Sequence, residues 1–389
     1  MKKNFYLLLL IFIGSNLTAQ EDTAKVKTLT LLSDQALGEG KDNSALTYAI
    51  KAKELSENLN YKNGIINACT TIGQINLRRE NYPEALKNYL TVIKLQEEQK
   101  NKSGVAVSYS NVGSIYQMQE NYAQALEFYF RSFKIHEELA NKNGIVNALS
   151  NIGNIYFSLA KYNFALEYYK KSLEIQKEAG NKRAMGVLYS NTGSIYENQN
   201  NYTEALKNYQ AAFKIQEEMN DKNGMSRSYY NMGSNFMRQG NNTEALKNYL
   251  QALKLKEEIG DKQGMAECYN KIGAIYIATN KKNEAQTYLK KSLELSKEIE
   301  SMNDIKSVYE NLYKLDSLNG NFKSALENYK TFIVYRDSIS NEENLKKTIQ
   351  MELQYSYDKK AVADAIRNEE AIKLEELKRQ LEIEKKKNK

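Results

Sequence analysis

The chain has 389 residues, of which 41% are hydrophobic and 26% charged, with a single proline and no tryptophan. This hydrophobic content excludes a disordered chain, and the lack of proline excludes an all-β or loop-rich protein, in which proline marks turns and strand edges. Lysine and arginine number 55 against 48 acidic residues and are evenly mixed, so we expect no nucleic-acid partner. One histidine and two cysteines are too few for a disulfide framework or a zinc site, and we expect neither a metal nor a cofactor.

The N-terminus has the composition of a targeting segment. Lys2 and Lys3 stand before an apolar run from Phe5 to Gly14, and small and polar residues follow as far as Ala19. The run is too short to cross a hydrocarbon core about 30 Å thick, and its flanks are typical of a secretory signal peptide. We therefore predict a signal peptide at residues 1–19; cleavage one residue later and a buried N-terminal helix are the alternatives. No nearby cysteine is placed to carry a lipid anchor. We expect an exported protein, in the periplasm or at the periplasmic face of the inner membrane of a Gram-negative host.

A forty-residue repeat then covers most of the chain. Glycines recur at this interval from Gly73 to Gly273, and alanines from Ala45 to Ala325, which defines eight units. Tyrosines lie three or four residues from these small residues, a spacing that places them on one helical face. Each unit is predicted to form two antiparallel helices, in the second unit at about residues 65–79 and 82–98. The small residues let neighbouring helices approach closely, and the aromatic rings fill the space between them.

Local signals support these helix starts. Pro83 falls in the first turn of a second helix, where its missing N–H costs little. Turn and cap signals such as Asn141-Lys-Asn-Gly144 separate the units. An asparagine followed three residues later by glutamate or glutamine forms a capping box at four second helices. The pairs are Asn81 with Glu84, Asn121 with Gln124, Asn201 with Glu204 and Asn241 with Glu244.

The segment from Asn151 to Tyr169 contains N-I-G-N-I-Y, then Y, A-L and Y-Y at fixed spacing. It resembles the tetratricopeptide repeat, and the six extra residues per unit resemble the long variant found in kinesin light chains, some scaffold proteins and bacterial signalling ectodomains. The resemblance implies an all-α solenoid of eight helix pairs, which we assign to residues 23–340. The end units depart from the pattern, because Ser33 and Tyr313 stand where the glycine belongs. Terminal repeats commonly deviate, since one side lacks a neighbour.

Residues 341–389 follow a different pattern. They lack proline and glycine, are highly charged, and place Leu345, Ile349 and Leu353, then Leu374, Leu377 and Leu381, at helical spacing. We predict one long charged helix that forms a coiled-coil stalk, through which two copies pair as a homodimer. The alternative is a helix that packs back as a cap on the last repeat.

The signal peptide, the long repeats and the segment Met351-Glu-Leu-Gln-Tyr-Ser-Tyr-Asp-Lys-Lys360 together resemble the extracytoplasmic half of Bacteroidetes-type repeat-containing sensor histidine kinases. The resemblance implies a sensory input module. In that family a transmembrane helix and an effector domain follow the charged helix. This chain has no second apolar run, phosphoacceptor region or ATP-binding glycine box. We therefore expect contact with a membrane only through a segment beyond Lys389.

No catalytic constellation of acid, base, nucleophile or metal ligand is evident, so an enzyme is not expected. Gly38-Glu-Gly40-Lys41 is a fragment of a phosphate-loop pattern, but it falls where a turn between helices is required. His136 occupies the register of Gln96, Gln176 and Gln216, and we expect it to be exposed. Cys69 and Cys268 lie five units apart, too far for a disulfide, and are expected to be reduced.

A ladder of asparagines marks the first helix of the units. They stand two residues before the glycine position, and the repeat family implies that this face lines a concave groove in which asparagine bonds the backbone of a bound peptide. An amide carries donors and an acceptor, so a row of amides suits an extended chain of any sequence. The alternatives are that the asparagines join neighbouring helices or reflect coding bias. The groove residues are Asn111, Asn151, Asn191, Asn231 and Asn311, with Ser110, Ser150, Ser190 and Asn154 beside them.

A second candidate site is an anion clamp. Arg227, Asn231 and Arg238 share one face of a first helix, and Lys271 continues the asparagine register one repeat along. These three cations would hold a carboxylate, with Tyr230 as a stacking surface. The alternative is that they pair with acids of the adjacent unit, such as Glu267.

The patterns together predict a non-catalytic module that binds a peptide or protein segment outside the cytoplasm. We expect the sensory input part of a membrane signalling protein, in which groove movement repositions the charged helix. The alternative is a soluble periplasmic scaffold that assembles protein partners.

Overall fold

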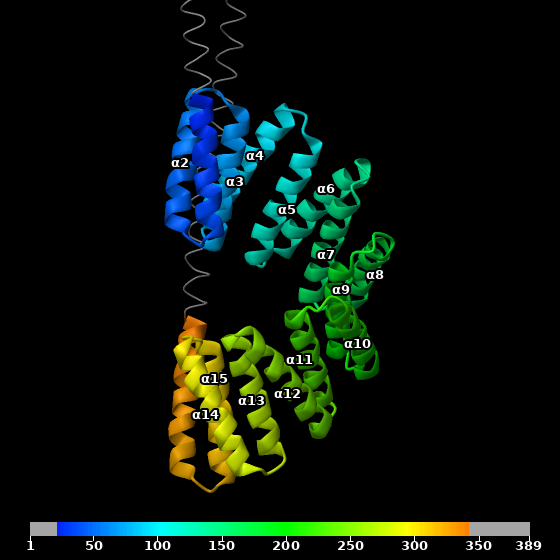
Figure 1. Cartoon of the computed structure of the whole chain (residues 1–389), viewed down its shortest axis with the longest axis vertical. Coiled ribbons are helices and arrows are strands. Elements are labelled where there is room, and N and C mark those ends of the chain that lie inside the picture. The colour runs from blue at the N-terminus through cyan, green and yellow to red at the C-terminus, as the bar shows by residue number, and fades with distance from the viewer. Residues whose placement is uncertain (1–21, 342–389) are drawn as a thin grey trace, which may run out of the picture. The chain divides into compact units, whose positions relative to one another are not determined.

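The computed structural model describes residues 22–341 (Figure 1). The predicted signal peptide and, apart from its first residue, the predicted charged helix at 341–389 lie outside the described residues. The described part contains sixteen helices and no strand, which confirms an all-α solenoid of eight helix pairs. The helices are residues 22–38, α2 (Asp42–Asn58), α3 (Lys62–Arg78), α4 (Tyr82–Glu98), α5 (Lys102–Met118), α6 (Tyr122–Glu138), α7 (Lys142–Ser158), α8 (Tyr162–Glu178), α9 (Lys182–Asn198), α10 (Tyr202–Glu218), α11 (Lys222–Arg238), α12 (Asn242–Ile259), α13 (Lys262–Ala278), α14 (Lys282–Glu298), α15 (Met302–Leu318) and residues 322–341.

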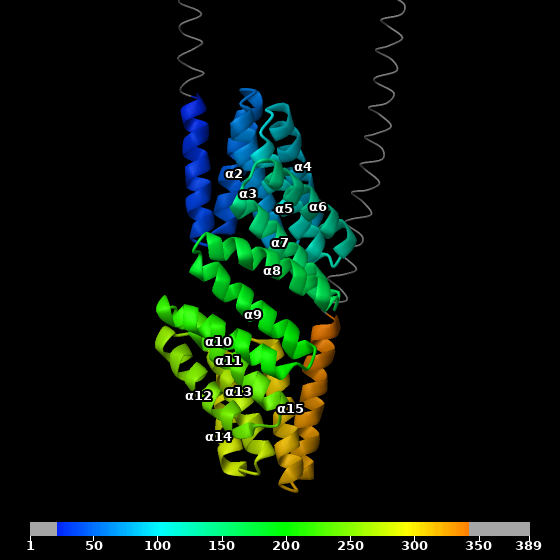
Figure 2. The ribbon, with the colours of Figure 1, turned by 90° about the vertical axis from the view of Figure 1, so that its right-hand side faces the viewer.

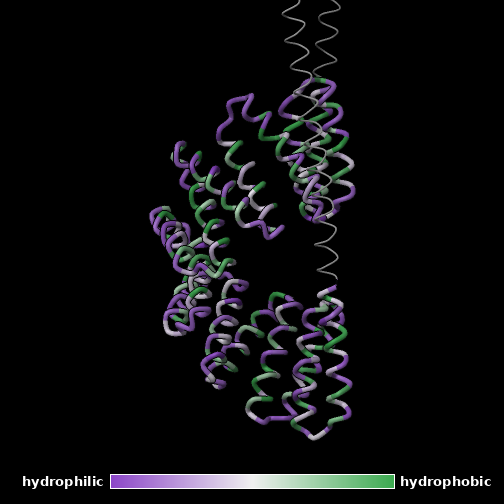
Figure 3. Tube along the Cα trace, turned by 180° about the vertical axis from the view of Figure 1, so that it is seen from behind, coloured by the Kyte–Doolittle hydropathy of each residue, from purple (hydrophilic) through white to green (hydrophobic). Residues whose placement is uncertain are grey.

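The described residues divide within α6 into two compact units, one ending at Phe128 and the other beginning at Tyr129. In each unit a helix packs against the helices before and after it along the chain, as Figure 2 shows for α7 to α15. Hydrophobic and hydrophilic segments alternate along every helix (Figure 3). Each pair thus buries its apolar residues against its partner and the next pair, so no pair has a core of its own.

The same turn ends every helix from residues 22–38 to α15. The backbone has a positive φ at every twentieth residue from Gly40 to Gly320, ten of them residues other than glycine. At the end of α6 the Ala140 N–H donates to the Glu137 carbonyl at 3.0 Å, and the Asn141 N–H donates to the His136 carbonyl at 2.9 Å. This is the Schellman arrangement, which satisfies the last carbonyls of a helix. Gly40 therefore ends a helix, as its position in the repeat predicts.

Helix boundaries agree with the predicted ones for the second helices, and α4 spans residues 82–98. The first helices begin about three residues earlier than predicted. The reason is that Lys-Asn-Gly forms the first helical turn, and the residue before it is the N-cap: the Gly144 N–H donates to Asn141 Oδ1 at 3.1 Å. At the second helices, three asparagine side chains accept a hydrogen bond from the backbone N–H three residues later, as predicted. They are Asn121, Asn201 and Asn241. Asn81 does not, because its amide instead donates to Asn76 Oδ1 at 3.1 Å.

The glycines that recur every forty residues allow the close helix packing that the sequence predicts. A Cβ at Gly153 would lie 2.6 Å from the Tyr169 ring, and one at Gly193 would lie 2.6 Å from the Tyr209 ring. Each tyrosine comes from the second helix of the same repeat and is buried. In the last repeat Tyr313 replaces this glycine, and its ring packs edge-on against Tyr329, which is 44% exposed.

A second set of glycines joins one repeat to the next. Gly104, Gly144 and Gly224, in the first turn of a first helix, lie against Gln96, His136 and Gln216 of the preceding second helix. His136 is consequently 4% exposed, and the expectation that it faces solvent is wrong. Burial lowers the pKa of His136 below its usual value. Cys69 and Cys268 are buried and free, as expected.

Candidate functional site

The first helices of neighbouring repeats contact each other in the second unit, where α9 touches α11 and α13 touches α15. In a stack of helix pairs, the side on which alternate helices meet is the inner side of the curve. The asparagine ladder lies on these helices. Within this unit its residues, Asn151, Asn191, Asn231 and Asn311, are all half-buried, as are Ser150, Ser190 and Asn154. In the first unit, Asn111 and Ser110 on α5 are also half-buried.

The ladder amides differ in what they already bind. Asn311 Nδ2 donates to Asn270 Oδ1 of the preceding first helix at 2.8 Å, which is the helix-joining role considered as an alternative. The Tyr169 hydroxyl donates to Asn154 Oδ1 at 2.5 Å. Burial raises the pKa of Tyr169 to about 12, and a hydrogen bond from Asn191 opposes this rise. Asn151 and Asn231 carry no side-chain hydrogen bond to any described residue, so their amides are open to a ligand.

The four residues of the predicted anion clamp do not line one pocket. Arg238 Nε lies 2.9 Å from Glu197 Oε1, a carboxylate of the preceding first helix that is only 6% exposed. Glu197 also accepts from the Tyr209 hydroxyl at 2.7 Å and from Ser234 Oγ at 3.1 Å. Burial, with a smaller contribution from this carboxylate, raises the pKa of Tyr209. Arg238 therefore pairs with an acid of the adjacent unit, although with Glu197 rather than Glu267.

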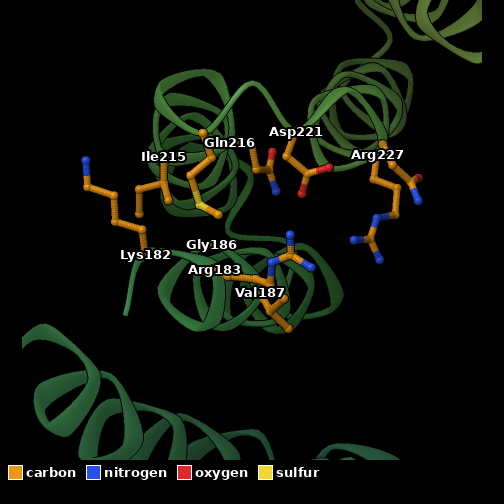
Figure 4. Close-up of a pocket in the computed structure, with 10 residues that line it drawn as sticks. Lys182, Arg183, Gly186, Val187, Ile215, Gln216, Asp221 and Arg227 are labelled. Atoms are coloured by element: carbon orange, nitrogen blue, oxygen red, sulfur yellow. The ribbon is translucent and has the colours of Figure 1, made fainter. Parts of the chain in front are cut away.

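Arg227 lies in a separate pocket of about 190 Å³ between α9, α10 and α11. Figure 4 shows Arg183 and Arg227 reaching toward the same space, beside Gln216 and Asp221. Neither arginine has an ion-pair partner in the described part of the chain. Lys182, at the pocket edge, is held by Glu218 at 2.8 Å. Three basic side chains and one acidic side chain line the pocket, which therefore carries a net positive charge.

Tyr230 and Lys271 line a larger pocket of about 470 Å³ that crosses α11, α13 and α15. Three acids share its lining, namely Glu267, Asp304 and Glu310, together with Asn270 and Asn311. With three carboxylates and one lysine, this pocket has the opposite charge to the one that the clamp hypothesis requires.

Glu197, Asn270 and Asp304 were absent from the sequence-based site. Asn270 stands one residue before the asparagine register, where the other repeats have serine, threonine, tyrosine or glutamate, and this difference is the one signal that pointed to it. Glu197 and Asp304 meet partners 37 to 41 residues away, such as Ser234 and Gln263. These groups come together because successive repeats stack on one another.

The described residues hold no group of histidine, cysteine, aspartate or glutamate side chains arranged to bind a metal ion. None of the described helices combines the length and apolar character that a membrane span requires.

A family model described as tetratricopeptide repeat matches residues 64–138, 144–218 and 224–298. The fold is similar to that of the apo form of the quorum sensor NprR from B. thuringiensis, with 17% identity, a TM-score of 0.60, and coverage of 80% of this chain and 87% of that one. It is also similar to aspartyl phosphate phosphatase F from Bacillus subtilis, with 14% identity, a TM-score of 0.58 and coverage of 74% and 75%.

The Rap conjugation gene regulator of plasmid pLS20, solved in complex with the Phr* peptide, is similar too, with 14% identity, a TM-score of 0.51 and coverage of 82% and 96%. At these identities the likeness concerns the fold alone. No curated protein matches the chain in sequence.

Proposed function

The chain belongs to the tetratricopeptide-repeat family, and we propose that it binds a peptide or protein segment along the face formed by its first helices. One observation carries the proposal: Asn151 and Asn231 occupy the same register, are half-buried, and have no hydrogen-bond partner among the described residues. An amide held in this way offers a donor and an acceptor to the backbone of an extended chain. The structural likeness to a regulator solved with a bound peptide supports the same use of the fold.

Selection of a displayed random peptide library on the purified chain tests this proposal. We expect enriched peptides whose affinity falls about tenfold in the double variant Asn151→Ala, Asn231→Ala, because each lost amide removes about one hydrogen bond. Gln210→Ala is the matched control, since Gln210 is an exposed amide on the second helix α10. Undiminished binding by a folded double variant would remove the asparagine ladder from the site.

We also propose that the chain works outside the cytoplasm, on the strength of the N-terminal segment. A phosphatase reporter that is active only in the periplasm, fused after residue 21, should be active in a Gram-negative host. Deletion of residues 5–14 removes the apolar run and should abolish this activity. Equal activity of the two fusions would show that this segment does not direct export.

We further propose that the chain is the sensory input part of a membrane signalling protein. A bound peptide would change the packing of the last repeats and so reposition the helix that leaves them, which continues unbroken through residue 341. Cysteine pairs placed in two copies of the tail should crosslink at different rates with and without a selected peptide. Crosslinking that no peptide alters would favour the alternative, a periplasmic scaffold whose tail serves for dimerisation.

A further inference from the structure

The pocket across α11, α13 and α15 contains two carboxylates, Glu267 and Asp304, to which only the neutral side chains of Gln263 and Ser301 donate among the described residues. Gln263 Nε2 donates to Glu267 Oε1 at 3.2 Å and to Asp304 Oδ2 at 2.7 Å, so a neutral amide brings the two acids close together. No lysine or arginine of the described residues forms an ion pair with either acid. Glu267 Oε2 and Asp304 Oδ1 accept no hydrogen bond within the described residues. Two neighbouring carboxylates repel each other, and a cation placed between them relieves the repulsion.

The third acid of the pocket is already neutralised. Glu310 Oε1 lies 2.7 Å from Lys314 Nζ on the same helix. Among the acids that line the pocket, Glu267 on α13 and Asp304 on α15 are therefore the two without an ion-pair partner in the described residues.

An amide in the same pocket offers a ligand a second kind of contact. Asn270 is 9% exposed and lines the pocket. Its Oδ1 accepts from Asn311, but its Nδ2 has no partner within residues 22–341. This donor is not fully buried, so it is open to the pocket, where a bound carbonyl group can accept a hydrogen bond from it. The pocket thus offers a donor for a backbone carbonyl beside two acceptors for a cation.

An aromatic ring completes the lining. Tyr230 packs edge-on against the buried Tyr249 ring, with 5.3 Å between their centroids. Burial raises the pKa of Tyr230, and the neighbouring Tyr249, Glu267 and Asp304 raise it further. A negatively charged pocket with an aromatic wall suits an ammonium or guanidinium group.

We propose that this pocket receives the lysine or arginine side chain of a bound peptide, with Glu267 and Asp304 as its acceptors and Asn270 as donor to the adjacent peptide carbonyl. The proposal rests on the proposed function and adds the chemistry of the ligand. It also reverses the predicted role of Lys271, whose positive charge competes with the ligand in this pocket. The positive pocket around Arg183 and Arg227 lies between α9, α10 and α11, so pockets of opposite charge occur at successive repeats.

The test uses the displayed random library on the full chain and on the variant Glu267→Gln, Asp304→Asn. Both replacements keep an acceptor for Gln263, and unfolding curves establish that the fold is intact. We expect the wild type to enrich peptides with lysine or arginine at one position, and the variant to enrich peptides without that preference. The selected basic peptide should bind the variant about tenfold more weakly, whereas its glutamine analogue should bind both proteins alike.

Two single variants sharpen the result. Lys271→Gln should leave binding of the basic peptide unchanged or strengthen it, whereas an anion clamp requires it to weaken. Glu294→Gln on α14, an exposed acid of a second helix, is the control and should change nothing. Enrichment with no basic preference, or weaker binding to Lys271→Gln, overturns this inference while the proposed function stands. Failure to enrich any peptide overturns the proposed function.

Discussion

Seven buried positions spaced by forty residues, from Ser56 to Ser296, lie where a second helix meets the first helix of the next repeat. Gln96 and Gln216 are satisfied there, because Ser108 and Ser228 donate to them at 2.8 and 2.6 Å. The residue equivalent to these serines beside His136 is an alanine, and His136 Nδ1 is buried without a partner in the described part of the chain. Two substitutions, histidine for glutamine and alanine for serine, thus leave a titratable group without a partner at this junction between repeats.

The stability of the second unit should therefore fall on acidification. Burial holds the pKa of His136 in the folded chain below the usual value of 6.5, so the unfolded chain binds the proton more readily. Stability is unaffected above about pH 6.5 and decreases as the pH drops toward 5. His136→Gln, which copies the residue of neighbouring repeats, should remove this dependence. Thermal midpoints measured between about pH 8 and pH 5 test it, and equal slopes for both proteins would contradict it.

The buried Glu197 carboxylate makes a second prediction at this scale. Arg238→Gln removes the one charged partner that Glu197 has among residues 22–341, leaving the neutral donors Tyr209 and Ser234. We expect a loss of about 1–3 kcal/mol in urea unfolding, which the double variant Glu197→Gln, Arg238→Gln should partly restore. Arg227→Gln on the same helix removes an exposed, unpaired charge and should change stability by less than about 0.5 kcal/mol. Equal effects of the two arginine variants would show that the Glu197 pair contributes nothing.

At the scale of the elements, identical turns hold helices of nearly identical length in register. Ala140 and Ala160 occupy the left-handed conformation in these turns, with φ values of 50° and 54°. Alanine is strained there, whereas glycine is not. Ala140→Gly and Ala160→Gly should each stabilise the chain by about 0.5–1 kcal/mol, after the greater entropy of unfolded glycine is deducted.

The matched control is Ala165→Gly, because Ala165 is fully buried within α8. There glycine should destabilise by about 1 kcal/mol or more, since helical propensity and packing are both lost. Chemical unfolding of the three variants measures the difference in sign. Destabilisation in all three would show that the turns are not strained.

At the scale of the whole molecule, the sequence predicts the contacts that recur in every repeat. It predicts few of the contacts that differ from one repeat to the next. The forty-residue spacing of glycine and tyrosine predicts the helix pairs and the contact of Gly193 with Tyr209, because both lie in one repeat at fixed separation. It does not predict the burial of His136, since the helix that covers it belongs to the next repeat. The same holds for the site: the asparagine face follows from the register, whereas the shared lining of Glu267 and Asp304 depends on how successive repeats are stacked.

This organisation predicts that a destabilising substitution in one repeat affects only that repeat and the repeats next to it. A Cβ at Gly224 would lie 2.7 Å from Gln216 Cγ, at the contact between α10 and α11. Gly224→Ala should therefore speed amide hydrogen exchange in α10 and α11 and leave α7 and α14 near wild-type rates, because each repeat contacts only its neighbours. At Gly186 in α9 a Cβ would meet its nearest atom at 3.7 Å, an ordinary contact. Gly186→Ala, the control, should slow exchange locally through better helix propensity. Equal acceleration from α7 to α15 in Gly224→Ala would mean that the unit opens as a whole, and that a ligand held by α13 and α15 acts on every repeat of the unit at once.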